Sequence, residues 1–416
     1  MSGPWSPLKI RVFRALWIAG LVSNIGTFMH IAAAGWTMTT LTSSPTLVGL
    51  VQTAWGVPGF LLALHAGAFA DMVDRRRLIA VTQVVALFIA GALAAMQWTN
   101  HLSVNWLLIG TFLESVALTI SAPAFMALTP EIVDADHLPQ AIGLDSVSRN
   151  IAQSVGPALA GAIIAAINPG AVFALNAISF IGIVVVTQRF KSTALRGPRQ
   201  KGVNHAIGEG VKYIVGTAHL RNVALRLTLV LGATSALTSV MPVVARKSLH
   251  VSASGFGLLS GALGVGSVAA VWVMPRVRAL LSTEMVVLSA AVVWSCGTAV
   301  FANTSHISIA IGAILVCGLG TMAMLTTMFS AFMVQLPDWV RGRGSSLAML
   351  MVWLGASIGA FAWGLVASKY GVSSALTAAA VLNVAIAIIN RWALPLRAGD
   401  GDRTRITSLE NSDSSH

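Results

Sequence analysis

The strongest constraint on this chain is an apolar run of about 20 residues that returns about every thirty residues, which is long enough to cross a bilayer as a helix. The chain has 416 residues, of which 56% are hydrophobic and only 10% are charged. Soluble domains carry roughly 25% charged residues, so this composition cannot cover a water-exposed surface. We therefore expect an all-α polytopic membrane protein.

Twelve runs qualify as spans. They cover residues 15–39, 46–70, 78–97, 103–128, 142–166, 170–189, 225–245, 254–275, 284–302, 305–334, 345–367 and 372–393. Lysine and arginine gather in every second loop, and the positive-inside rule places such loops in the cytoplasm. An even number of spans then places both termini there. Because topology accounts for the net charge of +12, we expect no nucleic-acid partner.

An internal repeat divides the chain into two halves. The matching residues are Gly49, Gly56, Ser154, Gly156 and Gly161 in the first half and Gly257, Gly264, Ser357, Gly359 and Gly364 in the second. The predicted organisation is a cytoplasmic N-terminus (1–14), two six-helix bundles (15–189 and 225–395), a cytoplasmic linker with an amphipathic helix (190–224) and a disordered tail (396–416). Parallel repeats of this kind are typical of transporters.

A short charged loop separates the second and third spans, and it carries a family resemblance. The stretch Gly67-x-Phe69-Ala70-Asp71-x-x-x-Arg75-Arg76 resembles the loop 2–3 signature of the major facilitator superfamily, although Met72 and Asp74 replace its usual Arg and Gly. Further stretches resemble the bacterial efflux subgroup that contains enterobactin exporters and macrolide-efflux-like proteins. They are Ala122-Pro123-Ala124, Pro130-Glu131-Ile132-Val133 with Leu138 and Ala141, Gly156 to Gly161, and Arg341-Gly342-Arg343. The resemblance spans roughly residues 8–395. It implies twelve transmembrane helices in two parallel-related six-helix halves.

The resemblance also implies a gate. In the family, the acid at the position of Asp71 rests against the start of span 11 and pairs with loop arginines. A helix N-terminus attracts an anion by roughly 0.3–2 kcal/mol, which suits a latch that opens during transport. The residues of this predicted latch are Gly67, Asp71, Asp74, Arg75, Arg76, Arg77 and Arg341. The alternative is that the arginines only keep the loop in the cytoplasm.

Ionisable residues inside spans are costly and therefore mark candidate sites. Glu114 lies well inside span 4, and His30 lies in span 1. Each is a candidate for proton coupling or for substrate contact, and each also has a purely structural interpretation. Asp145 and Arg149 stand four residues apart near the start of span 5, where they either pair with each other or take part in gating.

Two further sets complete the predicted site. Gly156, Pro157 and Gly161 predict a bend with a small-residue face, which in the family marks antiporters, and Gly355 and Gly359 predict a similar close contact. The cavity candidates are Ser23, Thr27, His30, Thr111, Glu114, Met322, Met324 and Met328. The methionines favour a soft wall for an amphipathic organic substrate.

The predicted function is proton-coupled export of a small drug-like or siderophore-like molecule by a monomer in the bacterial inner membrane. An uptake symporter for a small metabolite and a non-transporting membrane sensor remain as alternatives. The sequence contains no P-loop, no nucleophile–base set and no metal-ligand spacing. We therefore expect no enzymatic activity, cofactor or metal.

Overall fold

The computed structural model describes residues 3–189 and 216–393, and their secondary structure is helical throughout. The first six long helices are α1 (Arg11–Leu41), α2 (Pro45–Met72), α3 (Arg75–Trp98), α4 (Val104–Ile132), α5 (Leu138–Ala166) and α6 (Pro169–Arg189). The other six are α8 (Ala218–Val243), α9 (Ala253–Leu280), α10 (Thr283–Asn303), α11 (Ile307–Val334), α12 (Asp338–Tyr370) and α13 (Val372–Ala393). Short helical turns, η1 (Ser6–Lys9), η2 (Ala135–His137) and η3 (Val244–Ser248), adjoin α1, α5 and α8.

Eleven of these helices are long and apolar enough to cross a membrane, and α5 is the exception in the described residues. The polar residues in the first half of α5 lower its hydropathy. The predicted all-α membrane fold is confirmed. Helices extend past the predicted spans, since α8 begins at Ala218 and α12 at Asp338. The apolar run marks only the part of a helix inside the bilayer. Residues 190–215 and 394–416, which hold most of the predicted linker and tail, lie outside the described residues.

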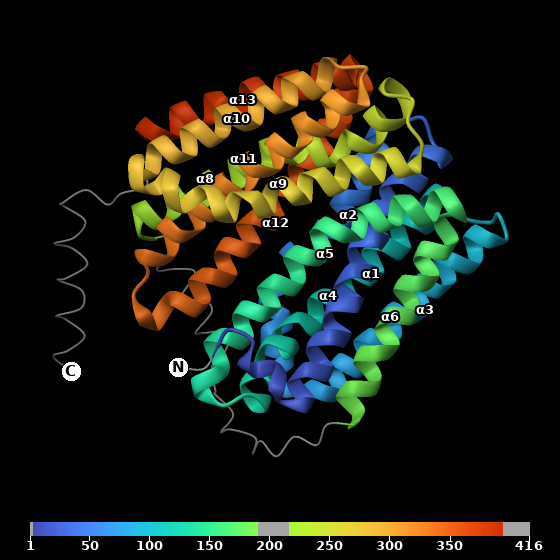
Figure 1. Ribbon diagram of the computed structural model, residues 1–416, viewed down its shortest axis with the longest axis vertical. Coiled ribbons are helices and arrows are strands. Elements are labelled where there is room, and N and C mark those ends of the chain that lie inside the picture. Colours follow the sequence, from blue (N-terminus) through green and yellow to red (C-terminus); the bar gives the residue numbers. More distant parts are fainter. Residues whose placement is uncertain (1–2, 190–215, 394–416) are drawn as a thin grey trace.

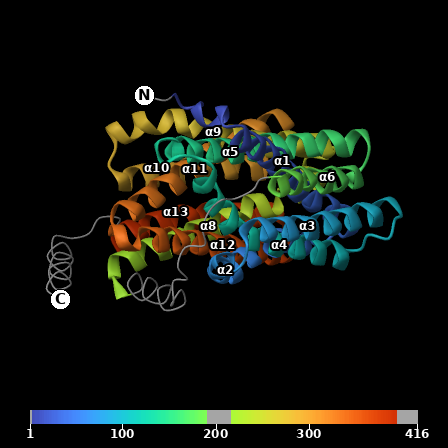
Figure 2. The same ribbon diagram turned by 90° about the horizontal axis from the view of Figure 1, so that it is seen from below.

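Helices α1–α6 form a first bundle and α8–α13 a second, and the two lie side by side (Figures 1 and 2). In the first bundle, α1 packs on α5 and α6, α3 packs on α4 and α6, and α2 packs on α4. In the second bundle, α8 packs on α12 and α13, α10 packs on α11 and α13, and α9 packs on α11. The two sets are equivalent, so both halves have the same internal packing.

The bundles meet mainly along two helix pairs, α2 with α12 (the first seam) and α5 with α9 (the second seam). A β-carbon on Gly56 would collide with Ser357 Oγ, and one on Gly264 would lie 2.7 Å from Ser154 Oγ. These four residues belong to the sequence repeat. Each glycine therefore faces the serine of the other half, and the backbones can approach closely because neither glycine has a side chain.

The two seams differ in their polar contacts. In the first seam, Thr46 Oγ1 donates to Gly364 O (3.2 Å) and Thr53 Oγ1 donates to Ser357 O (3.1 Å). In the second seam, Gly261 stands at the position equivalent to Thr53 and packs near Ala158 and Ser154 O. The first seam is hydrogen-bonded, whereas Gly261 offers no side-chain donor.

Further contacts join the bundles on the side opposite the N-terminus, where α1 ends and α8 continues into η3. Lys247 Nζ donates to Ser43 O (2.9 Å), and Arg246 Nη1 donates to Thr39 Oγ1 (3.3 Å). Below them, the rings of Trp36 and Phe256 stack with centroids 5.6 Å apart. These contacts hold the two bundles against each other on that side of the molecule.

Candidate functional site

Three polar side chains meet inside the first bundle, from three different helices: His30 of α1, Glu114 of α4 and Asn176 of α6. Each is 0% exposed. Asn176 Nδ2 donates to Glu114 Oε1 at 2.8 Å, and His30 Nδ1 lies 3.1 Å from Glu114 Oε2. We refer to these three residues as the buried triad.

Close packing of α1 on α6 brings the triad together. A β-carbon on Gly26 would lie 2.7 Å from Ser179 Oγ and 2.8 Å from Asn176 Oδ1. Only a glycine allows this approach, and His30 stands one helical turn further along α1. The His30 ring also packs against Phe173, with ring centroids 4.9 Å apart.

The geometry suits one exchangeable proton. With one proton between Glu114 and His30, the pair is neutral overall, as an acid and an imidazole or as a carboxylate and an imidazolium. Losing that proton leaves a net negative charge in a medium where an isolated charge is very costly. The Asn176 amide stabilises a carboxylate through its hydrogen bond, but it cannot neutralise one. A change of protonation in the triad therefore favours a change in the surrounding structure.

The structure brings together the two residues, His30 and Glu114, that the sequence suggested separately. Thr111, one turn before Glu114, is 0% exposed, and Ser23 is 5% exposed. Thr27 is half-buried. Asn176 was missed by sequence reasoning. Its only signal was an amide in an otherwise apolar run. In this conformation the triad is sealed within the first bundle rather than open to a cavity.

The predicted methionine wall belongs mostly to the core. Met324 and Met328 are 1% and 0% exposed and lie in the large apolar cluster of the protein, while Met322 is half-buried against it. In this conformation only Met322 has surface available to a ligand.

The charged loop is organised by Asp74, which caps α3. Its Oδ1 accepts hydrogen bonds from the backbone N–H groups of Arg76 (2.9 Å) and Arg77 (3.2 Å). Partial burial raises the pKa of Asp74. The two backbone hydrogen bonds and the charges of Arg76 and Arg77 outweigh burial and lower the pKa below its usual value. Asp74, unusual in the family signature, is thus explained as an N-cap.

The remaining latch residues are only partly described. Arg75 forms an ion pair with Glu131 at the end of α4, within the same bundle. Gly67 is half-buried with open space beside its Cα, and Arg77 is exposed. The side chains of Asp71 and Arg341 lie outside the described residues, so the contact between bundles that defines the latch remains a prediction.

The predicted small residues all lie at close helix contacts. A β-carbon on Gly156 would lie 2.8 Å from Phe28 Cβ of α1, and Gly161 approaches Gly257 across the second seam. Pro157 lies inside α5 between them, with its carbonyl close to Gly257. Gly355 and Gly359 instead bring α12 onto α8, against the carbonyls of Thr228 and Gly232.

Asp145 and Arg149 lie on the first half of α5. Asp145 is half-buried and Arg149 is exposed. The charge of Arg149 acts on Asp145 from one helical turn away. No carboxylate of the described residues lies within ion-pairing distance of Arg149.

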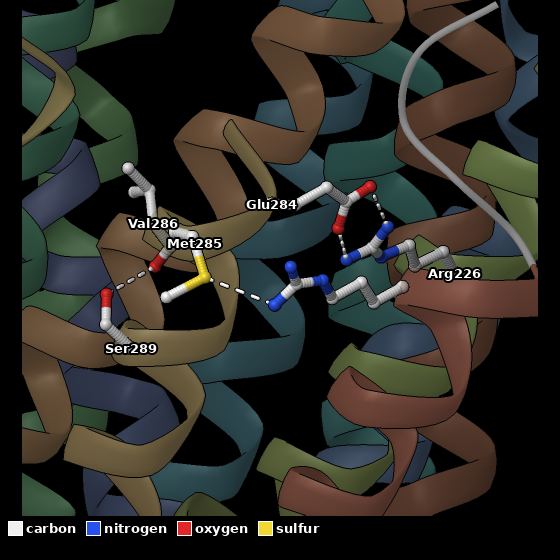
Figure 3. A network of polar contacts seen from close by, with 6 residues as sticks. Arg226, Glu284, Met285, Val286 and Ser289 are labelled. Atoms are coloured by element: carbon white, nitrogen blue, oxygen red, sulfur yellow. Dashed lines mark hydrogen bonds and ion pairs between the residues drawn. The ribbon is translucent and has the colours of Figure 1, made fainter. Parts of the chain in front are cut away.

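An ion pair between a buried arginine and a half-buried glutamate, which the sequence does not predict, lies in the second bundle. Arg226 of α8 has a side chain that is 1% exposed and binds Glu284 of α10 through two bonds, Nη1 to Oε1 (2.9 Å) and Nη2 to Oε2 (2.7 Å) (Figure 3). Glu284 lies in the first turn of α10, where the helix dipole favours an acid. Two-point pairing fixes the first turn of α10 to α8.

Residues 2–411 match the family model described as "Transmembrane secretion effector". The chain belongs to this family of the major facilitator superfamily. It is 23% identical over 329 residues to the staphyloferrin A transporter of Staphylococcus aureus, covering 78% of this chain and 82% of that protein. It is also 27% identical over 226 residues to the MFS-type transporter y4rN of Sinorhizobium fredii, covering 54% of this chain and 56% of that protein.

Solved structures support the same fold. A bacterial homologue of the human lysosomal transporter Spinster, in an inward-facing and occupied conformation, has a TM-score of 0.74 at 14% identity, covering 95% of this chain and 99% of that one. The nucleoside transporter NupG has a TM-score of 0.72 at 13% identity, covering 91% and 97%. The protein is a multi-pass membrane transporter of the major facilitator fold.

Proposed function

We propose that this family member is a proton-coupled exporter of a small amphipathic organic molecule, drug-like or siderophore-like, that works by alternating access. The observation that carries the proposal is the buried triad, in which Glu114 and His30 share one site without access to water. A proton can leave such a site only when the first bundle rearranges. Proton movement and conformational change are then coupled.

The proposed orientation places both termini and the arginine-rich loops in the cytoplasm of a bacterial cell, following the positive-inside rule. The contacts of Arg246, Lys247 and Trp36 then close the external side. This arrangement corresponds to an inward-facing state, in which an exporter takes up its substrate. The resemblance to a siderophore transporter supports the proposed substrate class.

Inverted membrane vesicles test the function. With an inside-acid gradient, an exporter should accumulate amphipathic organic compounds in the lumen as protons leave in exchange. The Glu114→Gln variant, which keeps the side-chain shape but cannot titrate, should lose gradient-driven accumulation. An uptake symporter would instead empty the lumen under the same gradient. If no compound moves with either gradient direction, the proposal of proton-coupled export is wrong.

A further inference from the structure

Helix α5 has two exposed faces of opposite chemistry. Ser146, Arg149 and Gln153 are exposed and Asn150 is half-buried, at the i, i+3, i+4, i+7 spacing of a single helix face. We call these four residues the α5 polar face. Val147, Ile151 and Val155 form a second face and are 40%, 39% and 40% exposed.

The contacts of α5 separate these two faces. One buried row of the helix, including Ser148 and Gly156, packs on α1, where Asn24 Nδ2 donates to Ser148 Oγ and Gly156 meets Phe28. Another row, including Ser154, packs on α9 at the second seam. The two exposed faces therefore lie on opposite sides of the plane through α1, α5 and α9.

The energetics of burial assign each face. Valine and isoleucine are stable against hydrocarbon, whereas a guanidinium inside a bilayer is tolerated only beside water or a partner. Arg149 stands seven residues after the start of the predicted span 142–166, which is about 10 Å along the helix axis. The apolar face therefore meets lipid, and the α5 polar face lines a water-accessible space between the bundles.

The polar face offers both hydrogen-bond donors and acceptors, and its one formal charge is positive. Asn150 Nδ2 donates to Ser146 O (2.9 Å), so its remaining side-chain atom is an acceptor. The charge on the face comes from Arg149, and no described carboxylate pairs with it. A guanidinium presents a planar set of donors that matches a carboxylate through two parallel hydrogen bonds.

We propose that the α5 polar face is a substrate-contact surface and that Arg149 binds an anionic group there, a carboxylate of an organic molecule. This inference deepens the proposed export function, on which its physiological meaning rests, and narrows the substrate to amphipathic organic anions. Gln153 and the Asn150 carbonyl bind hydroxyl or amide groups next to the carboxylate. Asp145, half-buried one turn before Arg149, disfavours a second anionic group at that end.

Cysteine labelling tests the surface without any transport assay. Cys296 is exposed and Cys317 is buried, so a Cys296→Ser variant has no native cysteine that the reagents can reach. Gln153→Cys is compared with its matched control Ile151→Cys in inverted vesicles, using water-soluble anionic and cationic methanethiosulfonates. We expect the Gln153→Cys variant to react and the Ile151→Cys variant to be protected. If the two cysteine variants are equally protected from the reagents, or if the Ile151→Cys variant reacts faster, the proposal is wrong.

The charge of Arg149 is tested on the same background. Adding Arg149→Gln to Gln153→Cys should reduce the preference for the anionic over the cationic reagent by roughly tenfold or more, because a unit charge about 6 Å away attracts one reagent and repels the other even in water. Arg149→Lys should retain the preference. Size-exclusion profiles establish that each variant is folded. An unchanged preference in Arg149→Gln would show that the face has no anion site.

Ligand chemistry is tested with a matched pair of probes, 2-naphthoate and 2-naphthamide, which share one apolar body. The carboxylate should protect the Gln153→Cys variant from labelling and the amide should not, and Arg149→Gln should abolish this protection. Equal protection by both probes would make the site apolar and contradict the inference. Because labelling needs no proton gradient, these results are independent of the export proposal, which fails or stands on the vesicle experiment.

Discussion

The first and second bundles share one packing scheme but bury their ionisable groups at different depths. In the first bundle, Glu114 lies ten residues into α4, in the middle of the fold, with His30 and Asn176 around it. The equivalent place in α11 is Cys317, which is fully buried and lies beside Thr298 and the carbonyl of Trp294. The ion pair of the second bundle instead joins Arg226, eight residues into α8, to Glu284 in the first turn of α10, next to the helix end.

This difference separates two uses of buried charge. A pair at the helix ends binds two helices together, and water is available if it opens. A titratable group in the middle of the bilayer has no water available to it, so its protonation state and the conformation of the protein depend on each other. Under the proposed mechanism, the first bundle contains the site that responds to protons, and the second bundle supplies a stable partner.

The largest expected effect comes from breaking the end pair of the second bundle. Arg226→Ala removes the guanidinium that binds both oxygens of Glu284, and each hydrogen bond to a charged group contributes about 1.5–3 kcal/mol. Thermal unfolding of the purified protein should show the loss. The double variant Arg226→Met with Glu284→Gln should recover most of the stability. Equal stability of single and double variants would contradict a charge-based cause.

The equivalent positions Glu114 and Cys317 give a direct contrast between the bundles. Glu114→Gln should abolish gradient-driven transport while the protein remains folded, because the shape is kept and only the exchangeable proton is lost. Cys317→Ser should leave gradient dependence intact, because nothing in the second bundle depends on a proton there. Transport against pH in vesicles measures both. Loss of pH dependence in both variants would remove the distinction between the bundles.

The packing of the triad predicts a smaller structural effect. Gly26→Ala places a methyl group against Ser179 and Asn176, and such overpacking costs about 1–3 kcal/mol. Gly20→Ala, with nothing within 4 Å of the added carbon, is the matched control on the same helix. A lower midpoint of thermal unfolding is expected for Gly26→Ala alone. Equal midpoints would mean that α1 and α6 can separate without cost.

The smallest effect concerns the equivalent caps of α3 and α10. Asp74 accepts two backbone hydrogen bonds, whereas Ser282, at the start of α10, makes no side-chain capping bond. Asp74→Ala should cost about 0.5–2 kcal/mol, and Ser282→Ala should cost less. Because the pKa of Asp74 is lowered in the fold, its contribution is present above the unfolded pKa and is lost as the pH falls through the folded value. The Asp74→Ala deficit should therefore shrink in acid, and a deficit independent of pH would contradict the charge of the cap.

The sequence predicts the fold, but it does not predict which side chains contact one another inside the bundles. Apolar runs gave the spans, and the glycines and serines of the repeat proved to be the residues that meet at the two seams. Asp74 could have been recognised as a cap, since an aspartate stands directly before a helix. Asn176 and the Arg226–Glu284 pair could not, because which faces of two helices meet depends on their rotation in the bundle. An apolar sequence contains little information on that rotation.

The seams have a consequence for ancestry. Gly56 faces Ser357 while Gly264 faces Ser154, and Gly49 faces Gly364 while Gly257 faces Gly161. In a symmetric dimer, residue i of one copy contacts residue j of the other, and j contacts i in return. The seams still satisfy that rule, although both copies now belong to a single chain. A six-helix ancestor that formed such a pair would have had this interface before its gene was duplicated. The differences between the threonines of the first seam and Gly261 of the second would then have arisen after the duplication, from one ancestral interface.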